Sequence, residues 1–213
     1  MLMNHLTELL LTVIATLFPI TNPLGNAAIF LSITDGDTPA ERRAQALRGS
    51  FYMFLLLAGF FLGGAWIMRF FGITLPGIRI AGGLVIAKIG FNLLTPKVEH
   101  THTPEENAEA KNKPDIAFSP LAMPLLAGPG AIAAVMGIAA NLPPRWDPVD
   151  DGVVLVGILL VSVACWLILR ESERLLKFLG VNGANALTKI MGFLLLCIGV
   201  QLVINGASAL KFL

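Results

Sequence analysis

The chain has 213 residues, of which 55% are hydrophobic and 14% charged, and its formal net charge is +1. A soluble domain would carry about a quarter charged residues, so this composition excludes an ordinary water-soluble protein. The near-neutral charge also argues against a nucleic-acid partner. We therefore expect an integral membrane protein whose main surroundings are the lipid bilayer.

Six segments are long and apolar enough to cross a membrane as helices. Uncharged runs cover 9–34, 51–68, 116–144, 152–169 and 190–210, and a sixth run, 80–95, is interrupted only by Lys88. A helix needs about 20 residues to cross roughly 30 Å of hydrocarbon. The sequence predicts an all-α fold of six transmembrane helices in one membrane domain. The first run has no basic flank and no cleavage pattern, so it is expected to be retained rather than removed as a signal peptide.

The first segment contains residues that a membrane helix usually lacks. In FPITNPLGN, residues 18–26, two prolines stand beside two asparagines and a glycine near the centre of the span. A lone proline kinks a helix by removing one hydrogen bond. Several such residues together leave backbone groups unpaired, which hydrocarbon does not tolerate unless protein or a wet cavity surrounds them.

The second and third segments carry small residues at helical spacing. Gly59 and Gly63 form one such pair, and Gly83 and Ala87 form another. This spacing predicts close helix packing rather than ligand contact. A polar loop over 96–115 then separates two halves, 1–95 and 116–213. His100 and His102 in that loop have no third ligand fixed nearby, so no metal site is expected.

The second half repeats the pattern of the first. The fourth segment, AFSPLAMPLLAGPGAIAAV, is broken by Pro124 and then by a Gly-Pro-Gly triplet, as the first segment is broken by Pro19 and then by Asn-Pro. The sixth segment aligns without a gap on the third, which places Gly192 on Gly83 and Gly199 on Gly90. Because three spans per half is an odd number, the halves would enter the membrane from opposite faces. We expect two inverted three-helix repeats with broken helices one and four, an architecture common among secondary transporters.

The chemistry of the two breaks suits a small zwitterion. The N-terminus of a half-helix carries partial positive charge and free N–H groups, which bind a carboxylate. Freed carbonyl groups suit an ammonium group or sodium. The predicted substrate-binding residues are Thr21, Asn22, Pro23, Gly25, Asn26, Gly128, Pro129 and Gly130.

Coupling is predicted from the residue types inside the uncharged runs. Proton-coupled carriers usually place a carboxylate or histidine within the membrane, and the runs contain neither, which favours Na⁺ as the coupling ion. No other cofactor is expected. The predicted ion ligands are Thr16, Thr21, Asn22 and Ser119, and the predicted supporting polar residues are Arg79, Lys88, Asn92 and Gln201. Alternatively, Lys88 snorkels toward the membrane surface and the amides bridge helices.

Orientation follows from the distribution of Lys and Arg. The loops after the first, third and fifth segments carry nine of these residues, against four on the opposite side. Cytoplasmic loops hold the excess of basic residues. We therefore expect the 96–115 loop in the cytoplasm and both termini in the periplasm.

Four stretches of the chain resemble one known family. FPITNPLGN, LPGIRIAGGLVIAKIGF, PLAMPLLAGPGAI and LTKIMGFLLLCIGVQLVINGA are similar to the MarC family of bacterial inner-membrane proteins, over nearly the whole chain. The resemblance implies a six-span carrier in the bacterial inner membrane, because the family is similar to small neutral amino acid transporters. The family's name refers to multiple antibiotic resistance, a role that membership does not establish. The positions that match its motifs are Asn22, Pro23, Gly25, Gly128, Pro129, Gly130 and Arg79.

The sequence thus favours a secondary transporter of small neutral amino acids or similar zwitterionic metabolites. The alternatives are an exporter of such metabolites, a small-solute channel and a non-transporting membrane scaffold. An enzyme is not expected, because the apolar segments contain no His, Cys and acid constellation. A homo-oligomer is compatible with this reading.

Overall fold

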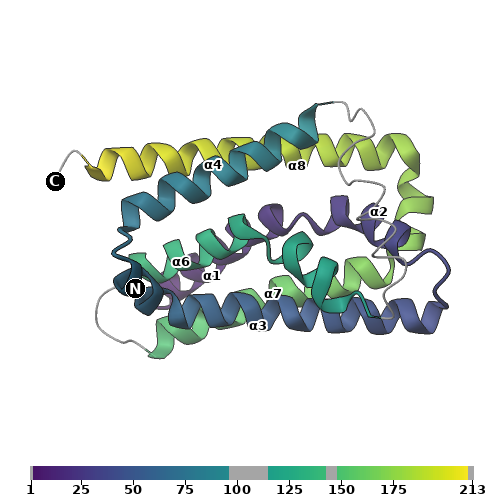
Figure 1. Cartoon of the computed structure of the whole chain (residues 1–213), viewed down its shortest axis with the longest axis horizontal. Helices are drawn as coiled ribbons and strands as arrows, with labels where there is room; N and C mark the ends of the chain where they lie inside the picture. Colours follow the sequence, from purple (N-terminus) through teal and green to yellow (C-terminus); the bar gives the residue numbers. More distant parts are fainter. Residues whose placement is uncertain (1, 96–114, 143–147, 211–213) are drawn as a thin grey trace.

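The computed structural model describes residues 2–95, 115–142 and 148–210, and every element in these ranges is helical (Figure 1). The 96–114 part of the predicted loop, with both of its histidines, lies outside the described residues. The elements are α1 (Leu2–Thr21), α2 (Pro23–Ile33), α3 (Pro39–Phe71), α4 (Leu75–Leu94), η1 (Ala117–Leu126), α6 (Pro129–Asn141), α7 (Pro148–Arg170) and α8 (Ser172–Leu210).

The helices account for the predicted number of membrane crossings. Five segments of the described chain are long and apolar enough to span a bilayer, and η1 with α6 makes a sixth if the bent pair counts as one span. α1 and α2 together form the first span. The start of α1 and the end of α8 lie at the same end of the bundle (Figure 1), as an even number of crossings requires.

Local sequence explains where several helices begin, end or turn. Thr38 and Glu41 form a capping box at the start of α3, with Pro39 in the first turn. α3 ends at Gly72, whose φ of 63° is left-handed and favours glycine. Within α8, Gly180 has a φ of 63° and a ψ of 174°, and the chain turns there from a short first part into the membrane span.

The two halves have corresponding contacts between their helices. α3 and α7 lie side by side; α1 and α2 pack on α7, while η1 and α6 pack on α3. α4 and α8 form a separate layer, in which α4 contacts α6 and α8 contacts α2 (Figure 1). The core between the layers holds fully buried side chains from most of these elements, among them Leu17, Phe30, Met53, Ile86, Leu126, Ile158 and Leu195.

The α4–α8 interface is built on the glycines that the sequence aligned. A Cβ on Gly83 would lie 2.6 Å from the carbonyl oxygen of Gly199, and a Cβ on Gly90 would lie 2.6 Å from that of Gly192. The two helix backbones therefore touch, which only glycine permits. Close packing at Gly83 is confirmed. It is wrong for Gly59 and Gly63 within this chain, because a Cβ at either position would meet no described atom within 4 Å.

α7 begins a turn earlier than the uncharged run from which it was predicted. It starts at Pro148, so Asp150 lies in its first turn, 6% exposed. The Asp150 Oδ1 atom is 3.6 Å from Nδ1 of His5 in α1. The uncharged run 152–169 contains no acidic residue, but α7 extends beyond that run and includes Asp150 and Asp151 in its first turn. The uncharged run underestimated the helix because a helix can begin with a charged turn at the membrane surface.

Candidate substrate site at the helix breaks

Two asparagine side chains repair the backbone at the first break. Asn22 is left-handed, with φ 41° and ψ 55°, and its Oδ1 accepts from the N–H of Gly25 at 3.2 Å. In a continuous helix that N–H would donate to the carbonyl of Thr21, four residues earlier. The Thr21 carbonyl instead accepts from Nδ2 of Asn26 at 2.9 Å. One lost helical bond is thus replaced by two side-chain bonds.

The same Asn26 amide reaches the second break. Pro129 has no N–H, so the carbonyl of Leu125, four residues earlier, loses its helical donor. Asn26 Nδ2 donates to that carbonyl at 3.0 Å. Asn26 is 8% exposed, so its amide is a buried link between α2 and η1. The structure brings the two breaks together through one side chain.

The two breaks differ in severity. α1 and α2 together form one continuous membrane-spanning segment of 30 residues, Asn4–Ile33. In contrast, η1 and α6 meet at an angle of 63°. η1 itself is irregular, with extended backbone at Ser119 and Met123. The description as two half-helices therefore fits the second break, while the first is a local defect in a nearly continuous helix.

The predicted break residues are mostly buried. Thr21, Asn22, Pro23, Asn26 and Gly130 are buried, Gly25 and Gly128 are half-buried, and Pro129 is exposed. The Thr21 hydroxyl donates to the carbonyl of Phe18 at 3.1 Å and lies 3.6 Å from Sγ of Cys165. A Cβ on Gly128 would lie 2.7 Å from the carbonyl oxygen of Pro124. Glycine at 128 is thus required by the sharp turn itself.

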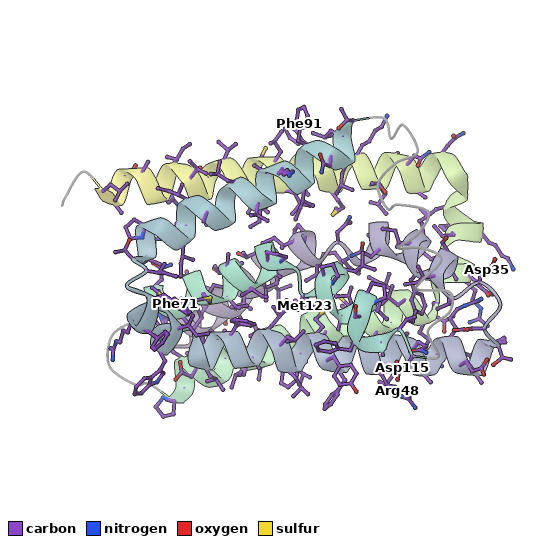
Figure 2. The ribbon with its side chains drawn as sticks, in the orientation of Figure 1. Asp35, Arg48, Phe71, Phe91, Asp115 and Met123 are labelled. Carbon is purple, nitrogen blue, oxygen red and sulfur yellow. The ribbon has the colours of Figure 1, made fainter. Side chains whose placement is uncertain are left out.

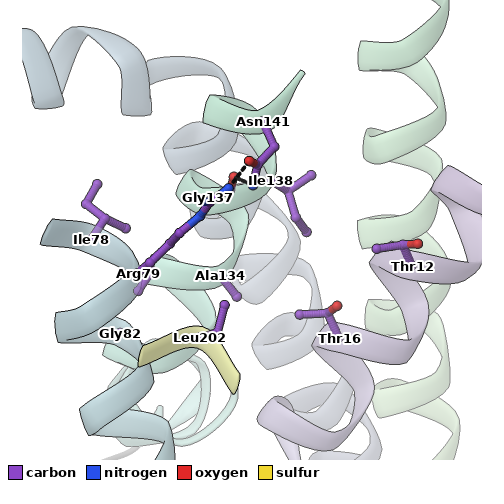
Figure 3. Close-up of a pocket in the computed structure, with 11 residues that line it drawn as sticks. Thr12, Thr16, Ile78, Arg79, Gly82, Ala134, Gly137, Ile138, Asn141 and Leu202 are labelled. Carbon is purple, nitrogen blue, oxygen red and sulfur yellow. Dashed lines mark hydrogen bonds between the residues drawn. The ribbon is translucent and has the colours of Figure 1, made fainter. Parts of the chain in front are cut away.

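A cavity of about 170 Å³ lies between α1, α4, α6 and α8 (Figure 3), and its described lining includes none of the eight predicted substrate-binding residues. Arg79 is the charged side chain among its described lining residues. It is half-buried and donates to Oδ1 of Asn141, and Nδ2 of Asn141 donates to the carbonyl of Gly137 at 2.7 Å. Arg79 therefore also interacts with the negative C-terminal end of α6. The lining residues are Thr12, Thr16, Ile78, Arg79, Gly82, Ala133, Ala134, Gly137, Ile138, Asn141 and Leu202.

Thr16 is the lining residue of α1 that lies nearest to the first break along the chain. It is half-buried, and no described residue forms a hydrogen bond with its hydroxyl, whereas the hydroxyl of Thr12 donates to the carbonyl of Glu8 at 2.7 Å. Thr16 precedes Thr21 by five residues, which is about 7.5 Å along a helix. The cavity thus contains two predicted residues, Thr16 and Arg79. Sequence reasoning missed Asn141, although a polar residue at the end of an apolar run was a visible signal.

Four other predicted residues lie away from the cavity. Ser119, Lys88, Asn92 and Gln201 are exposed, and Nε2 of Gln201 donates within its own helix to Asn205 at 2.8 Å. The buried face of α4 consists of Ile78, Gly82, Gly83, Ile86 and Gly90. An exposed lysine on the opposite face fits the alternative of snorkelling for Lys88.

Comparison with known proteins identifies the family. The model of the MarC family integral membrane proteins matches residues 7–210. The chain belongs to the MarC family. Relatives from Escherichia coli (strain SMS-3-5 / SECEC) and Citrobacter koseri, both named UPF0056 inner membrane protein MarC, are 39% and 40% identical over 202 residues and cover 91% of each chain. No solved structure matches the chain at a significant level.

Proposed function

We propose that this MarC family protein is a secondary transporter of small neutral amino acids or similar small zwitterions across the bacterial inner membrane. The observation that carries the proposal is the junction of two helix breaks at the buried Asn26 amide, together with a cavity of the same bundle whose described lining includes Arg79 as its charged residue. Broken helices in corresponding positions of two repeats are typical of transporter binding sites.

The cavity offers a partner for each end of a zwitterion. The Arg79 guanidinium has donors beyond the one that Asn141 accepts, and guanidinium groups bind carboxylates in a bidentate manner. The free Thr16 hydroxyl and nearby backbone carbonyls can accept from an ammonium group. At about 170 Å³ the cavity is well below the ~300–1,000 Å³ of drug-sized sites. This size favours a small substrate.

The contacts between helices in one half have counterparts in the other half, which supports an inverted repeat. If each element is replaced by its counterpart in the other half, the contact of α6 with α4 becomes that of α2 with α8, which is also present. Likewise, the contact of Gly83 with Gly199 becomes the contact of Gly192 with Gly90. We propose that the halves exchange the accessible side of the site by rocking about this interface, with both termini in the periplasm.

Two observations favour different coupling ions. Hydroxyl and amide oxygens at Thr16, Thr21 and Asn22 are suitable ligands for sodium, which we retain as the first proposal. The Thr21 hydroxyl donates to Phe18 and Oδ1 of Asn22 accepts from Gly25, and each oxygen retains a lone pair that can ligate sodium. Proton coupling is the second candidate, and its observation is the contact of His5, 56% exposed, with the buried Asp150 in the first turn of α7; carboxylate and histidine pairs form proton relays in transporters when they line the transport path.

Transport by proteoliposomes tests the proposal directly. Purified protein is reconstituted, and uptake of labelled glycine, alanine and serine is measured under a sodium gradient, a pH gradient and neither. A carrier gives saturable uptake that is accelerated by unlabelled substrate on the opposite side. A linear, non-saturable flux would identify a channel, and no flux of any of these solutes would contradict the proposed substrate class.

Arg79→Gln is the variant that examines carboxylate recognition. It should weaken competition by glycine while leaving competition by glycinamide, which lacks the carboxylate, unchanged. Arg69→Gln removes an exposed arginine at the end of α3 and serves as the matched control. Equal loss in both variants would place carboxylate recognition elsewhere.

A further inference from the structure

A second site lies at the opposite end of the bundle from Arg79, where α3 meets the junction of α7 and α8. A pocket of about 220 Å³ is lined there by four arginines, two glutamates and Pro39. The arginines exceed the glutamates, so the pocket carries net positive charge. The residues are Arg42, Arg43, Arg170, Arg174, Glu171 and Glu173.

The arginines of this pocket have different partners. Arg42 is 16% exposed, donates to the hydroxyl and the carbonyl of Thr34 at 3.0 and 3.1 Å, and pairs with Glu173. It therefore joins the end of α2 to the start of α8. Arg174 and Arg170 both pair with Glu171, at 2.7 and 3.4 Å. Arg43 is exposed and forms no ion pair with any described residue, so its charge is available to a ligand.

An apolar groove of about 210 Å³ adjoins this pocket on the outer surface. Leu47, Phe51 and Phe54 from α3 line it together with Leu159, Val163 and Trp166 from α7. Leu47 follows Arg43 by one helical turn, and Trp166 precedes Arg170 by one turn, so the groove begins where the basic pocket ends. The Arg170 guanidinium carbon lies 5.5 Å from the centre of the Trp166 ring. That contact joins the two sites.

A buried polar atom also lies in the apolar groove. Ser50, which lines the groove, is 3% exposed, and its hydroxyl has no hydrogen-bond partner among the described residues. A buried hydroxyl without a partner is costly. The ligand that fills the groove should therefore bring a polar acceptor next to an apolar chain.

We propose that the Arg43–Arg170–Arg174 pocket and the groove between α3 and α7 together bind one anionic phospholipid. The headgroup phosphate lies among the arginines, an acyl chain lies along the groove, and an ester oxygen accepts from Ser50. Basic pockets at the ends of membrane helices bind anionic headgroups in this way. Because the predicted orientation places this end in the cytoplasm, the lipid comes from the leaflet that is richer in anionic headgroups.

Quenching of Trp166 fluorescence tests the assignment. Trp66→Phe and Trp146→Phe leave Trp166 as the single tryptophan of the three in the chain. The protein is reconstituted into phosphatidylcholine vesicles that contain increasing fractions of brominated phosphatidylglycerol or brominated phosphatidylcholine. Half-maximal quenching should require at least about a fivefold lower fraction of the anionic lipid, the factor that corresponds to ~1 kcal/mol per basic residue. Equal quenching by the two lipids would overturn the proposal.

Matched variants separate a site from general surface charge. Arg43→Gln should raise the fraction of anionic lipid at half-maximal quenching by about fivefold. Arg48→Gln should leave that fraction unchanged. Arg48 is on the same helix but pairs with Asp115 outside the pocket (Figure 2). Equal effects of the two changes would mean that anionic lipid is attracted by the surface charge in general, and would overturn the proposed lipid site.

The groove has its own matched pair. Leu159 and Leu160 are both 45% exposed, but only Leu159 is among the residues lining the groove. Leu159→Phe should weaken quenching and Leu160→Phe should not, and equal effects would contradict acyl-chain binding there. Inorganic phosphate in excess should not reverse the quenching, because it has no chain. Reversal would assign the pocket to a soluble anion instead.

Discussion

Removing the amide of Asn26 should destabilise the junction of the two breaks. Asn26→Ala deletes the donor to Thr21 at 2.9 Å and the donor to Leu125 at 3.0 Å. Removing each bond leaves a carbonyl without its donor, which costs about 1–2 kcal/mol. The expected loss in the free energy of unfolding is about 2–4 kcal/mol, which lowers the melting temperature by roughly 4–16 °C in a protein of this size.

Thermal unfolding in detergent measures this loss through a cysteine. Cys165 is buried and Cys197 is exposed, so in a Cys197→Ser background a thiol-reactive dye reports the exposure of Cys165 on unfolding. Asn26→Asp keeps the side-chain shape, but an ionised carboxylate cannot donate and a protonated one can donate only one of the two bonds, so it should also destabilise the junction. Asn92→Ala changes an exposed amide and should stay within about 0.5 kcal/mol of the wild type. Equal melting temperatures for Asn26→Ala and Asn92→Ala would refute the role of the amide.

Two further predictions concern the helix layer and the topology. Gly199→Ala should separate α4 from α8 and lower the melting temperature, because its Cβ would lie 2.5 Å from the backbone nitrogen of Ala87. Gly59→Ala should leave the melting temperature unchanged, because its Cβ would meet no described atom within 4 Å. Equal melting temperatures for the two variants would contradict the packing of α4 on α8. A periplasmic activity reporter fused after residue 213 should be active and one within 96–114 inactive, and the reverse result would invert the proposed orientation.

Composition and the length of apolar runs determined the class of this protein. Hydrocarbon forces every backbone group to find a partner within its own helix, so uncharged runs of about 20 residues predict the six spans without any tertiary information. The sequence also showed a repeated set of glycines, namely Gly83, Gly90, Gly192 and Gly199. Two helix backbones can touch only where side chains are absent. The position of each glycine in the sequence therefore predicts where such a contact can form.

Only the tertiary structure decided what the breaks do and where the cavity lies. Proline marks a lost hydrogen bond, but the replacement donor for Leu125 comes from Asn26, 99 residues earlier in the chain. Arg79 and Asn141 likewise meet across a separation of 62 residues. Gly59 and Gly63 have the same spacing as a packing pair yet face no described atom of the chain. Periodicity shows which residues share a face of one helix, whereas the partner of that face depends on how all the helices assemble.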